Sequence, residues 1–264
     1  IAARALCPEA QILVIAGVFP GQGAAVIEHR LTVVAWETWQ LDELALAARA
    51  AQLPPAALPL HLEIDTGMSR QGVSPEALAQ LFPRFAPGSP LRLEGVMTHL
   101  FAADEADGQV TAVQLALLDE TLSRISSAGL FAEWLNVGNS AALLAGQAQP
   151  SADLAARHGM KAMLRPGLAL YGLVPHFDPD FGADEPASLI HARAHLQPVL
   201  GWKTRIVSLR DVPAGAVVGY NGTFVSTEPM RLALLALGYA DGLDRRLGNR
   251  FSLLVRGTRA PLVG

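Results

Sequence analysis

The chain has 264 residues, of which 51% are apolar and 17% charged. This composition is typical of a chain that buries a core, so general disorder is excluded. The net charge of −4 disfavours a nucleic-acid binder, and no apolar run reaches the ~18 residues that a membrane-spanning helix needs. The single Cys7 excludes an internal disulfide framework and a cysteine-cluster metal site, and it suits a cytoplasmic protein.

Short apolar runs alternate with helical stretches over the first two thirds of the chain. The runs predicted to be strands are 12–15, 31–36, 60–65, 93–100, 135–138 and 163–170, and the predicted helices are 41–52, 75–85 and 107–127. This alternation predicts parallel βαβ units, and therefore either a (β/α)8 barrel or an open doubly wound sheet. A barrel needs eight strands, so either two strands escape detection or the chain is cut short.

The pattern changes in the last third of the chain. Residues 178–187 are rich in Asp, Pro and Gly, which indicates a linker. Beyond it the β-like runs are 194–210, 231–237 and 251–256, separated by turn residues, and no long helix is predicted. We therefore expect a barrel domain over residues 1–185 and a mainly β domain over residues 186–264.

Polar residues follow the predicted barrel strands where each strand ends. They are Glu63, Arg70, His99, Asn139, Ser140 and Arg165. Catalytic groups of barrels gather at this edge. Glu63 shares a strand face with His61, on the side that would point into the barrel, and Arg70 is its nearest candidate partner in sequence.

Each of these residues also has a structural interpretation. Asn139 and Ser140 are a helix cap or an anion site, and His99 is a structural histidine or a functional one. Arg70 is a surface arginine or a carboxylate ligand. His191 and His195 have the spacing of metal ligands, but on the predicted strand they would share a solvated face, so no metal site is expected.

Longer motifs surround these residues. They are Glu63-Ile-Asp-Thr-Gly-Met-Ser-Arg70, Met97-Thr-His-Leu100, Asn139-Ser-Ala-Ala142, Arg165-Pro-Gly-Leu-Ala-Leu-Tyr-Gly172, Val218-Gly-Tyr-Asn-Gly222, Gly238-Tyr-Ala-Asp-Gly242 and Ala260-Pro-Leu-Val-Gly264. In this order and spacing they resemble the alanine racemases, pyridoxal 5'-phosphate (PLP) enzymes of bacterial cell-wall metabolism. The resemblance covers nearly the whole chain. It implies a partial TIM-type PLP-binding barrel followed by a β domain.

The resemblance also implies roles for single residues. Tyr220 matches the catalytic tyrosine, one of two opposed bases, and His99 matches the histidine beside the pyridine ring. Arg165 matches the arginine at the pyridine nitrogen. The phosphate site corresponds to Asn139, Ser140, Gly167 and Leu168. Arg70 matches an arginine near the substrate carboxylate, and Tyr239 a tyrosine at the substrate entrance.

Three features depart from the family pattern. Neither lysine, Lys161 or Lys203, matches the Schiff-base lysine of the first barrel strand, and the motif around that lysine is absent. The chain ends at Gly264, where family members continue. We therefore expect an internal piece of a longer protein, inactive by itself. Glu63 stands where many members carry a carbamylated lysine, and our hypothesis is that it orients Arg70.

The expected function is that of an isomerase, an alanine racemase fragment. The parent homodimer, with shared active sites, would interconvert L- and D-alanine through PLP by a two-base mechanism and supply D-alanine for peptidoglycan. The alternatives are a broader amino-acid racemase, a non-catalytic PLP-barrel binding protein, and a phosphate-binding lyase or aldolase. Retention of Tyr220, His99 and Arg165 together disfavours the binding protein, because a binder needs no second base.

Overall fold

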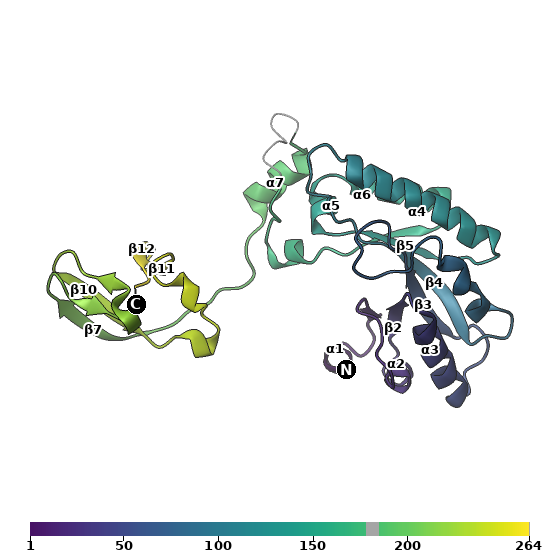
Figure 1. Ribbon diagram of the computed structural model, residues 1–264, viewed down its shortest axis with the longest axis horizontal. Coiled ribbons are helices and arrows are strands. Elements are labelled where there is room, and N and C mark those ends of the chain that lie inside the picture. Colours follow the sequence, from purple (N-terminus) through teal and green to yellow (C-terminus); the bar gives the residue numbers. More distant parts are fainter. Residues whose placement is uncertain (178–184, 264) are drawn as a thin grey trace. The chain divides into compact units, whose positions relative to one another are not determined.

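The structure is a computed structural model that describes residues 1–177 and 185–263. The chain divides into two compact units, Ile1–Val199 and Leu200–Gly264 (Figure 1). Sequence analysis placed the domain boundary between residues 185 and 186, nearer the N-terminus. Of the predicted linker 178–187, residues 178–184 lie outside the described residues.

The first unit is built on one six-stranded sheet in which every neighbouring pair is parallel. Its strands are β1 (Leu13–Val14), β2 (Thr32–Ala35), β3 (Leu58–Glu63), β4 (Leu91–Met97), β5 (Trp134–Gly138) and β6 (Lys161–Leu164). They lie side by side in chain order. A doubly wound sheet would reverse that order at a switch point, so the sheet is part of a barrel wall. Each of the six predicted runs contains a strand of this sheet, but the last run, 163–170, is wrong beyond Leu164, because its end forms the 3₁₀ turn η3 (Leu168–Tyr171).

Helices between the strands cover one face of the sheet (Figure 1). They are α2 (Gly23–Glu28), α3 (Thr38–Ala50), α4 (Gln109–Ser127), α5 (Ser140–Leu144) and α6 (Ala148–Arg157), while the short α1 (Ala2–Leu6) precedes the first strand and buries no residue. The core forms where their apolar faces meet the sheet, for example at Leu44 of α3, Leu118 of α4 and Leu154 of α6. Leu60 and Leu62 of β3 face this core, which leaves the other face of β3 to His61 and Glu63.

The segment 75–85 is not the regular helix that its proline-led start predicted. It forms two short 3₁₀ turns, η1 (Leu78–Gln80) and η2 (Phe82–Phe85). Pro83 lies inside the segment and has no N–H to donate to the preceding turn, so an α-helix cannot continue through it. The other two predicted helices are confirmed as α3 and α4.

Helix α7 (Ala187–His195) belongs to the first unit, although no helix was predicted there. Leu189 and Ala192 pack with Leu144 of α5 in a small second core. The prediction that His191 and His195 lie on a strand is therefore wrong. On the helix their rings stack with centroids 4.0 Å apart, and the Nδ1 atom of His195 lies 2.8 Å from the carbonyl oxygen of His191.

The second unit is built from short antiparallel strands, in agreement with the predicted β domain. The strands are β7 (Ile206–Val212), β8 (Val217–Val218), β9 (Phe224–Val225), β10 (Met230–Leu235), β11 (Ser252–Val255) and β12 (Thr258–Pro261). They pair as β7 with β10, β8 with β9 and β11 with β12. Short 3₁₀ turns carry Tyr220 in η5 (Tyr220–Gly222) and Tyr239 in η6 (Tyr239–Asp241).

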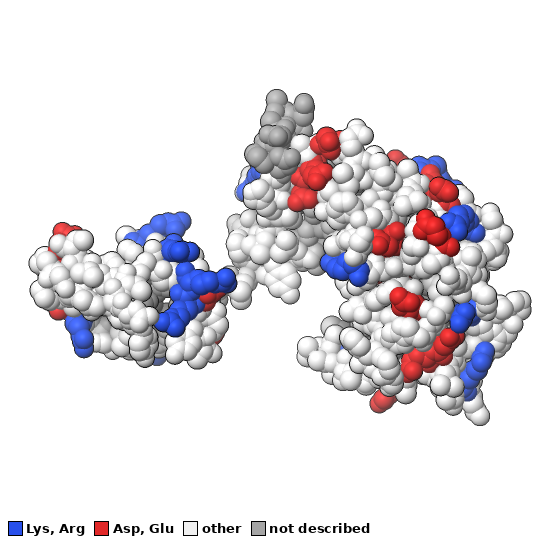
Figure 2. All heavy atoms as spheres, in the orientation of Figure 1, with Lys and Arg blue, Asp and Glu red and all other residues white. Residues whose placement is uncertain are grey.

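The two units carry charge of opposite sign. Residues 1–199 contain 20 acidic and 11 basic residues, whereas residues 200–264 contain 4 acidic and 9 basic ones. Basic side chains accordingly gather on the visible face of the β-rich unit (Figure 2). The net charge of −4 is therefore the sum of −9 on the acidic barrel unit and +5 on the basic β unit. Within the described residues, no helix is both long and apolar enough to cross a membrane.

Candidate active site

The carboxyl ends of β3, β4, β5 and β6 bring the predicted site residues of the first unit to one edge of the sheet. Glu63 is the last residue of β3, His99 follows β4, Asn139 follows β5 and Arg165 follows β6. Parallel strands in chain order place these positions side by side. The clustering that the sequence predicted is therefore present in the structure.

Glu63 is buried, with 2% of its surface exposed, and its hydrogen-bond partner is Gln71. Nε2 of Gln71 donates to Oε2 of Glu63 at 2.5 Å and to the carbonyl oxygen of Ile15 at 3.1 Å. Burial raises the pKa of the Glu63 carboxyl group, while the Gln71 bond and the nearby charges of Arg165 and Arg70 oppose that rise. The expectation that Arg70 is the direct partner of Glu63 is wrong, because the neighbouring amide reaches the carboxylate instead.

The loop that carries Arg70 is closed by its own hydrogen bonds. Asp65 Oδ1 accepts from the backbone N–H groups of Gly67 and Ser69, at 2.9 and 3.1 Å. At the base of the loop, Val73 N donates to the carbonyl oxygen of Glu63 at 2.8 Å. The exposed Arg70 side chain makes no hydrogen bond or ion pair with the described residues. It is therefore held at the rim by its backbone, with its guanidinium free.

Arg165 lies half-buried and donates into the ends of two strands. Nη1 donates to the backbone oxygen of Asn136 at 2.9 Å and also to its side-chain oxygen, and Nη2 donates to the carbonyl oxygen of Thr98 at 3.0 Å. Burial lowers the pKa of Arg165 to about 10, and the carboxylate of Glu63 opposes that shift. The arginine is thus a fixed cation at the inner end of the site.

His99 lies against Arg165. Its Nδ1 atom is 3.3 Å from Nη2 of Arg165, and its Nε2 atom is 3.4 Å from Nδ2 of Asn139. Burial, then the charges of Arg165 and Arg70, lower the pKa of His99 to about 4. The imidazole is therefore uncharged at neutral pH, and it can accept a proton or a hydrogen bond at one ring nitrogen.

Asn139 is a helix cap, and Ser140 collects two main-chain amides. Asn139 Oδ1 accepts from Ala142 N at 2.9 Å, and its Nδ2 donates to the carbonyl oxygen of Leu100 at 2.8 Å. The buried Ser140 Oγ accepts from Gly167 N at 2.9 Å and from Ala169 N at 3.2 Å. The cap interpretation thus holds for Asn139, while Ser140 marks a point where N–H donors converge.

The structure leaves the roles of three predicted residues untested. Leu168 is half-exposed, and the second amide that reaches Ser140 comes from Ala169 rather than from Leu168. Tyr220 and Tyr239 lie in the second unit, where they are 78% and 71% exposed. Their roles stay predictions.

The lysine of the first unit lies at the opposite end of the strands. Lys161 begins β6, whereas Arg165 follows its end. Its Nζ donates to Oε1 of Glu133 at 2.8 Å and lies 5.2 Å from the centroid of the Trp134 ring. Lys161 is therefore a surface residue of the amino end and takes no part in the site.

Sequence reasoning missed Gln71, Gln114 and Ala169. Gln114 lies one turn before Leu118 on the buried face of α4, so a polar residue within an apolar stripe was its available signal. Gln71 directly follows the Arg70 motif, but nothing in the sequence distinguishes its amide from a surface glutamine. Ala169 contributes only its backbone N–H, which no sequence pattern identifies.

The fold and this edge together define a class of protein. Main-chain amides converge on one hydroxyl group near the half-buried cation of Arg165, at the carboxyl end of parallel barrel strands. Barrels bind phosphate-bearing ligands at this end. Residues 1–175 match the N-terminal domain of alanine racemase and residues 199–264 match its C-terminal domain. The chain belongs to the alanine racemase family.

Individual relatives agree with this assignment. The chain is 36% identical over 253 residues to the alanine racemase of Syntrophobacter fumaroxidans. The matched region covers 96% of the chain and 61% of the relative. The crystal structure of the alanine racemase from Streptomyces lavendulae is 28% identical, with a TM-score of 0.81 over 100% of the chain and 64% of that structure. The alanine racemase of Bartonella henselae, a structure with covalently bound pyridoxal phosphate, shares the fold at 23% identity and a TM-score of 0.73, over 99% of the chain and 65% of that structure. The chain thus spans about 61% of the length of the first of these relatives.

Proposed function

We propose that the protein containing this chain is an alanine racemase that interconverts L- and D-alanine with PLP and supplies D-alanine for peptidoglycan. Family membership supports the reaction class. The observation that carries the proposal is the convergence of the Gly167 and Ala169 amides on Ser140, beside the pair of Arg165 and His99. A phosphate group and an aromatic ring nitrogen are the two features of PLP that these groups suit.

The Ser140 cluster fits a phosphate group. Two N–H donors and one hydroxyl group point at a common region, and a phosphate oxygen is a stronger acceptor than the hydroxyl oxygen that they reach now. Asn139 holds the start of α5 through its cap, so this region keeps its shape. We assign the cofactor phosphate to Ser140, Gly167 and Ala169, with Asn139 and Leu168 flanking it.

Arg165 and His99 fit the ring of the cofactor. A guanidinium group has donors only, so Arg165 can donate to the pyridine nitrogen without giving it a proton. His99, neutral because its pKa is about 4, can lie beside an aromatic ring without placing a second full charge there. PLP when bound supplies the electron sink that makes the α-proton of an amino acid removable.

The remaining residues bind substrate and move the proton. Racemisation needs bases on opposite faces of the α-carbon, and Tyr220 is the base that this chain contributes. Arg70 has an unpaired guanidinium at the rim, suited to the substrate carboxylate. We place Glu63 behind that loop, where it acts through Gln71, and we place Tyr239 at the substrate entrance.

The assembly belongs to the same proposal. We infer a cytoplasmic homodimer in which Tyr220 serves the site of the partner subunit. The supporting argument is the family resemblance, together with the high exposure of Tyr220 in its own unit. Sedimentation of the whole protein should give twice the mass of its full-length subunit.

An enzyme-coupled assay of the whole protein tests the proposal. With PLP present, L-alanine should give D-alanine, which a D-amino-acid oxidase detects, and Ser140→Ala should lower the affinity for PLP. A panel of serine, lysine and arginine separates an alanine enzyme from a broader racemase. PLP binding without turnover of any amino acid would contradict the proposal and favour a binding protein.

A further inference from the structure

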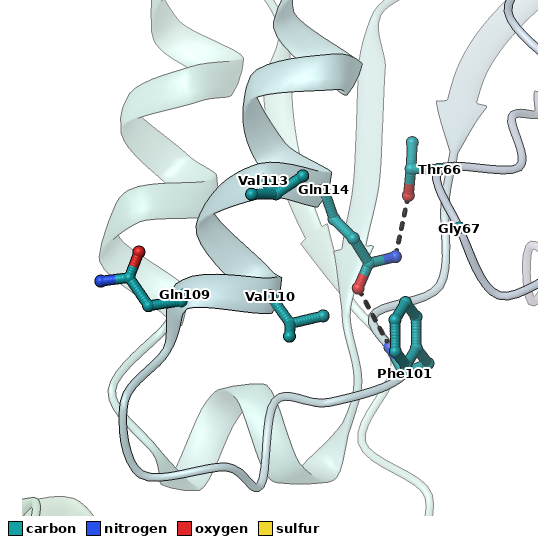
Figure 3. Close-up of a pocket in the computed structure, with 7 residues that line it drawn as sticks. All are labelled: Thr66, Gly67, Phe101, Gln109, Val110, Val113 and Gln114. Carbon is teal, nitrogen blue, oxygen red and sulfur yellow. Dashed lines mark hydrogen bonds between the residues drawn. The ribbon is translucent and has the colours of Figure 1, made fainter.

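Gln114 of α4 is a buried polar residue that links the loops after β3 and β4. Its side chain is 1% exposed. Nε2 donates to Oγ1 of Thr66 at 2.9 Å and to the carbonyl oxygen of His99 at 3.0 Å, and Oε1 accepts from Phe101 N at 3.2 Å. Figure 3 shows the amide pointing from the helix toward both loops, with Thr66 on one side and Phe101 on the other.

The partners leave this amide only one orientation. Phe101 N can only donate, so it requires the oxygen of Gln114. The carbonyl of His99 can only accept, so it requires the nitrogen. A flipped amide would place two donors together at Phe101 N and two acceptors together at the carbonyl of His99. The amide therefore has one orientation, and in it Gln114 bonds to the loops after β3 and β4.

A directed chain of hydrogen bonds continues from Thr66. The hydroxyl group of Thr98 donates to the carbonyl oxygen of Ile64 at 2.8 Å, which uses its only proton. In the 2.8 Å contact between the two threonine hydroxyls, Thr66 must therefore be the donor. The chain runs from Gln114 through Thr66 and Thr98 to Ile64, with every proton assigned.

Thr98, a member of this chain, also contacts the groups that hold the proposed cofactor ring. The carbonyl oxygen of Thr98 accepts from Nη2 of Arg165, and the same nitrogen lies beside His99. Gln114 holds the backbone of His99 from the other side, at its carbonyl oxygen. The loop that follows Thr66 carries Arg70.

We propose that Gln114 is a positioning residue that sets His99 against Arg165 and fixes the Arg70 loop beside them. The inference rests on the proposed function for its catalytic consequence, but its geometric content stands on contacts within the first unit. Packing alone does not explain the residue, because leucine fills the equivalent position one turn later, at Leu118. A buried amide at Gln114 is retained at the cost of desolvation, which its three hydrogen bonds offset.

The chain offers a matched control on the same helix. Gln109 lies on the first turn of α4 and lines the same pocket of about 330 Å³ as Gln114, but it is exposed and its side chain forms no hydrogen bond with the described residues (Figure 3). Gln109→Leu and Gln114→Leu therefore make the same chemical change. They differ in whether the rim loops lose their bonds.

The first readout needs neither substrate nor turnover. In the whole protein, Gln114→Leu should speed amide hydrogen exchange at Phe101 roughly tenfold, because its acceptor is lost. Histidine NMR titration should show the pKa of His99 rising above about 4 as its ring leaves Arg165. Gln109→Leu should leave both values unchanged. Unchanged exchange and titration in Gln114→Leu would overturn the proposal.

A second variant covers the case in which Gln114→Leu does not fold. Gln114→Met keeps the length of the side chain and adds no charge, but it lacks the N–H donors and the carbonyl acceptor. Exchange at Phe101 should again speed up, and the titration of His99 should again shift. Values for both that match the unsubstituted protein in Gln114→Met would equally overturn the proposal.

Kinetics of the PLP-loaded protein give the catalytic readout. Gln114→Leu should lower kcat roughly 10- to 100-fold with a smaller change in KM, since small displacements of reacting groups have effects of this size. A loss confined to thermal stability, with kcat intact, would identify Gln114 as structural only. If the unsubstituted protein has no racemase activity, the proposed function fails, while exchange and titration still decide the positioning role.

Discussion

Nη2 of Arg165 lies 3.3 Å from Nδ1 of His99, and the other ring nitrogen of His99 faces Nδ2 of Asn139. Both neighbours of the imidazole are donors, and one of them carries a full positive charge. A second proton on the ring would have no acceptor at these two contacts and would be repelled by Arg165. The site therefore keeps His99 neutral at pH 7. A neutral imidazole can lie beside the proposed cofactor ring without adding a second positive charge next to Arg165.

The neutrality of His99 gives a first prediction. Replacing the neighbouring cation in Arg165→Gln should raise the pKa of His99 from about 4 toward its ordinary value, but only in part, because burial is the larger cause. Histidine NMR titration measures the shift. Arg157→Gln, which removes a surface pair with Asp119, is the control and should leave His99 unchanged. An unchanged pKa in Arg165→Gln would contradict the assigned contact.

The pH dependence of stability gives a second prediction. Burial is the main cause that lowers the pKa of both His61 and His99 to about 4, against 6.5 in the unfolded chain. Between these values the unfolded state binds more protons, so the free energy of unfolding should fall as pH falls from 6.5 to 4. For His61 the limiting slope is about 1.4 kcal/mol per pH unit.

Urea unfolding at several pH values measures this slope. In His61→Gln the slope of the free energy of unfolding against pH should lose the contribution of the His61 imidazole, because glutamine does not titrate. Equal slopes in the two proteins would show that His61 protonates freely in the folded state. Glu63, whose pKa burial raises, titrates in the same window with the opposite effect on stability, but it is present in both proteins, so the difference between their slopes reports on His61.

Ser140→Ala gives a third prediction. The change removes the acceptor of two amides and one donor to the proposed phosphate, so the affinity for PLP should fall roughly 10- to 100-fold. Titration with PLP, followed by its absorbance, measures the loss. Ser151→Ala removes a serine bond within α6 and should leave PLP affinity unchanged. Equal affinity in Ser140→Ala would place the phosphate elsewhere.

The bond between Gln71 and Glu63 gives a fourth prediction. Gln71→Leu leaves a buried carboxylate without its donor, which should raise the pKa of Glu63 further. A raised folded pKa favours the protonated folded state, so Gln71→Leu should be destabilised more at pH 7 than at pH 4.5. Denaturant unfolding at both pH values measures the difference.

Two variants complete the fourth test. Glu63→Gln combined with Gln71→Leu should lose the pH-dependent part of the destabilisation, because the titrating group is gone. Gln80→Leu, at an exposed position, should have no such dependence. The hypothesis that Glu63 supports Arg70 additionally requires Glu63→Gln to change substrate affinity or rate, and an unchanged enzyme would refute it.

Gly95 gives a fifth prediction. A Cβ at this position of β4 would lie 2.4 Å from Cε1 of His61, a buried ring on the neighbouring strand. Gly95→Ala should therefore destabilise the protein by about 1–3 kcal/mol through overpacking. Thermal unfolding checks this value, and Gly201→Ala, where a Cβ meets nothing within 4 Å, is the control. Equal melting temperatures would mean that the His61 ring moves aside freely.

Strand positions were predictable because each strand is a short apolar run between turn residues, and each of the six runs contains a strand of one sheet. The run 163–170 is the exception in length, since it is a strand only to Leu164. The structure of the segment 75–85 was predicted wrongly. Its proline-led start indicated a regular helix, which the second proline, Pro83, prevents. Residues 187–195 were missed because the reason for their helix lies in the contact of Leu189 with Leu144, more than forty residues away in the chain.

The amino-acid sequence by itself determined the alternation of strands and helices, the β-rich second unit, the residues at the strand ends and the family, since these follow from patterns along the chain. The choice between a barrel wall and a doubly wound sheet came from the order of the strands in the structure. Tertiary structure alone decided which groups meet. In the structure Glu63 accepts a hydrogen bond from Gln71 and none from Arg70, and Ser140 accepts one from the Ala169 amide. Gln114 links the two loops after β3 and β4. Hydrogen-bond partners depend on directions and distances of a few tenths of an ångström, and only the packed sheet and helices set these.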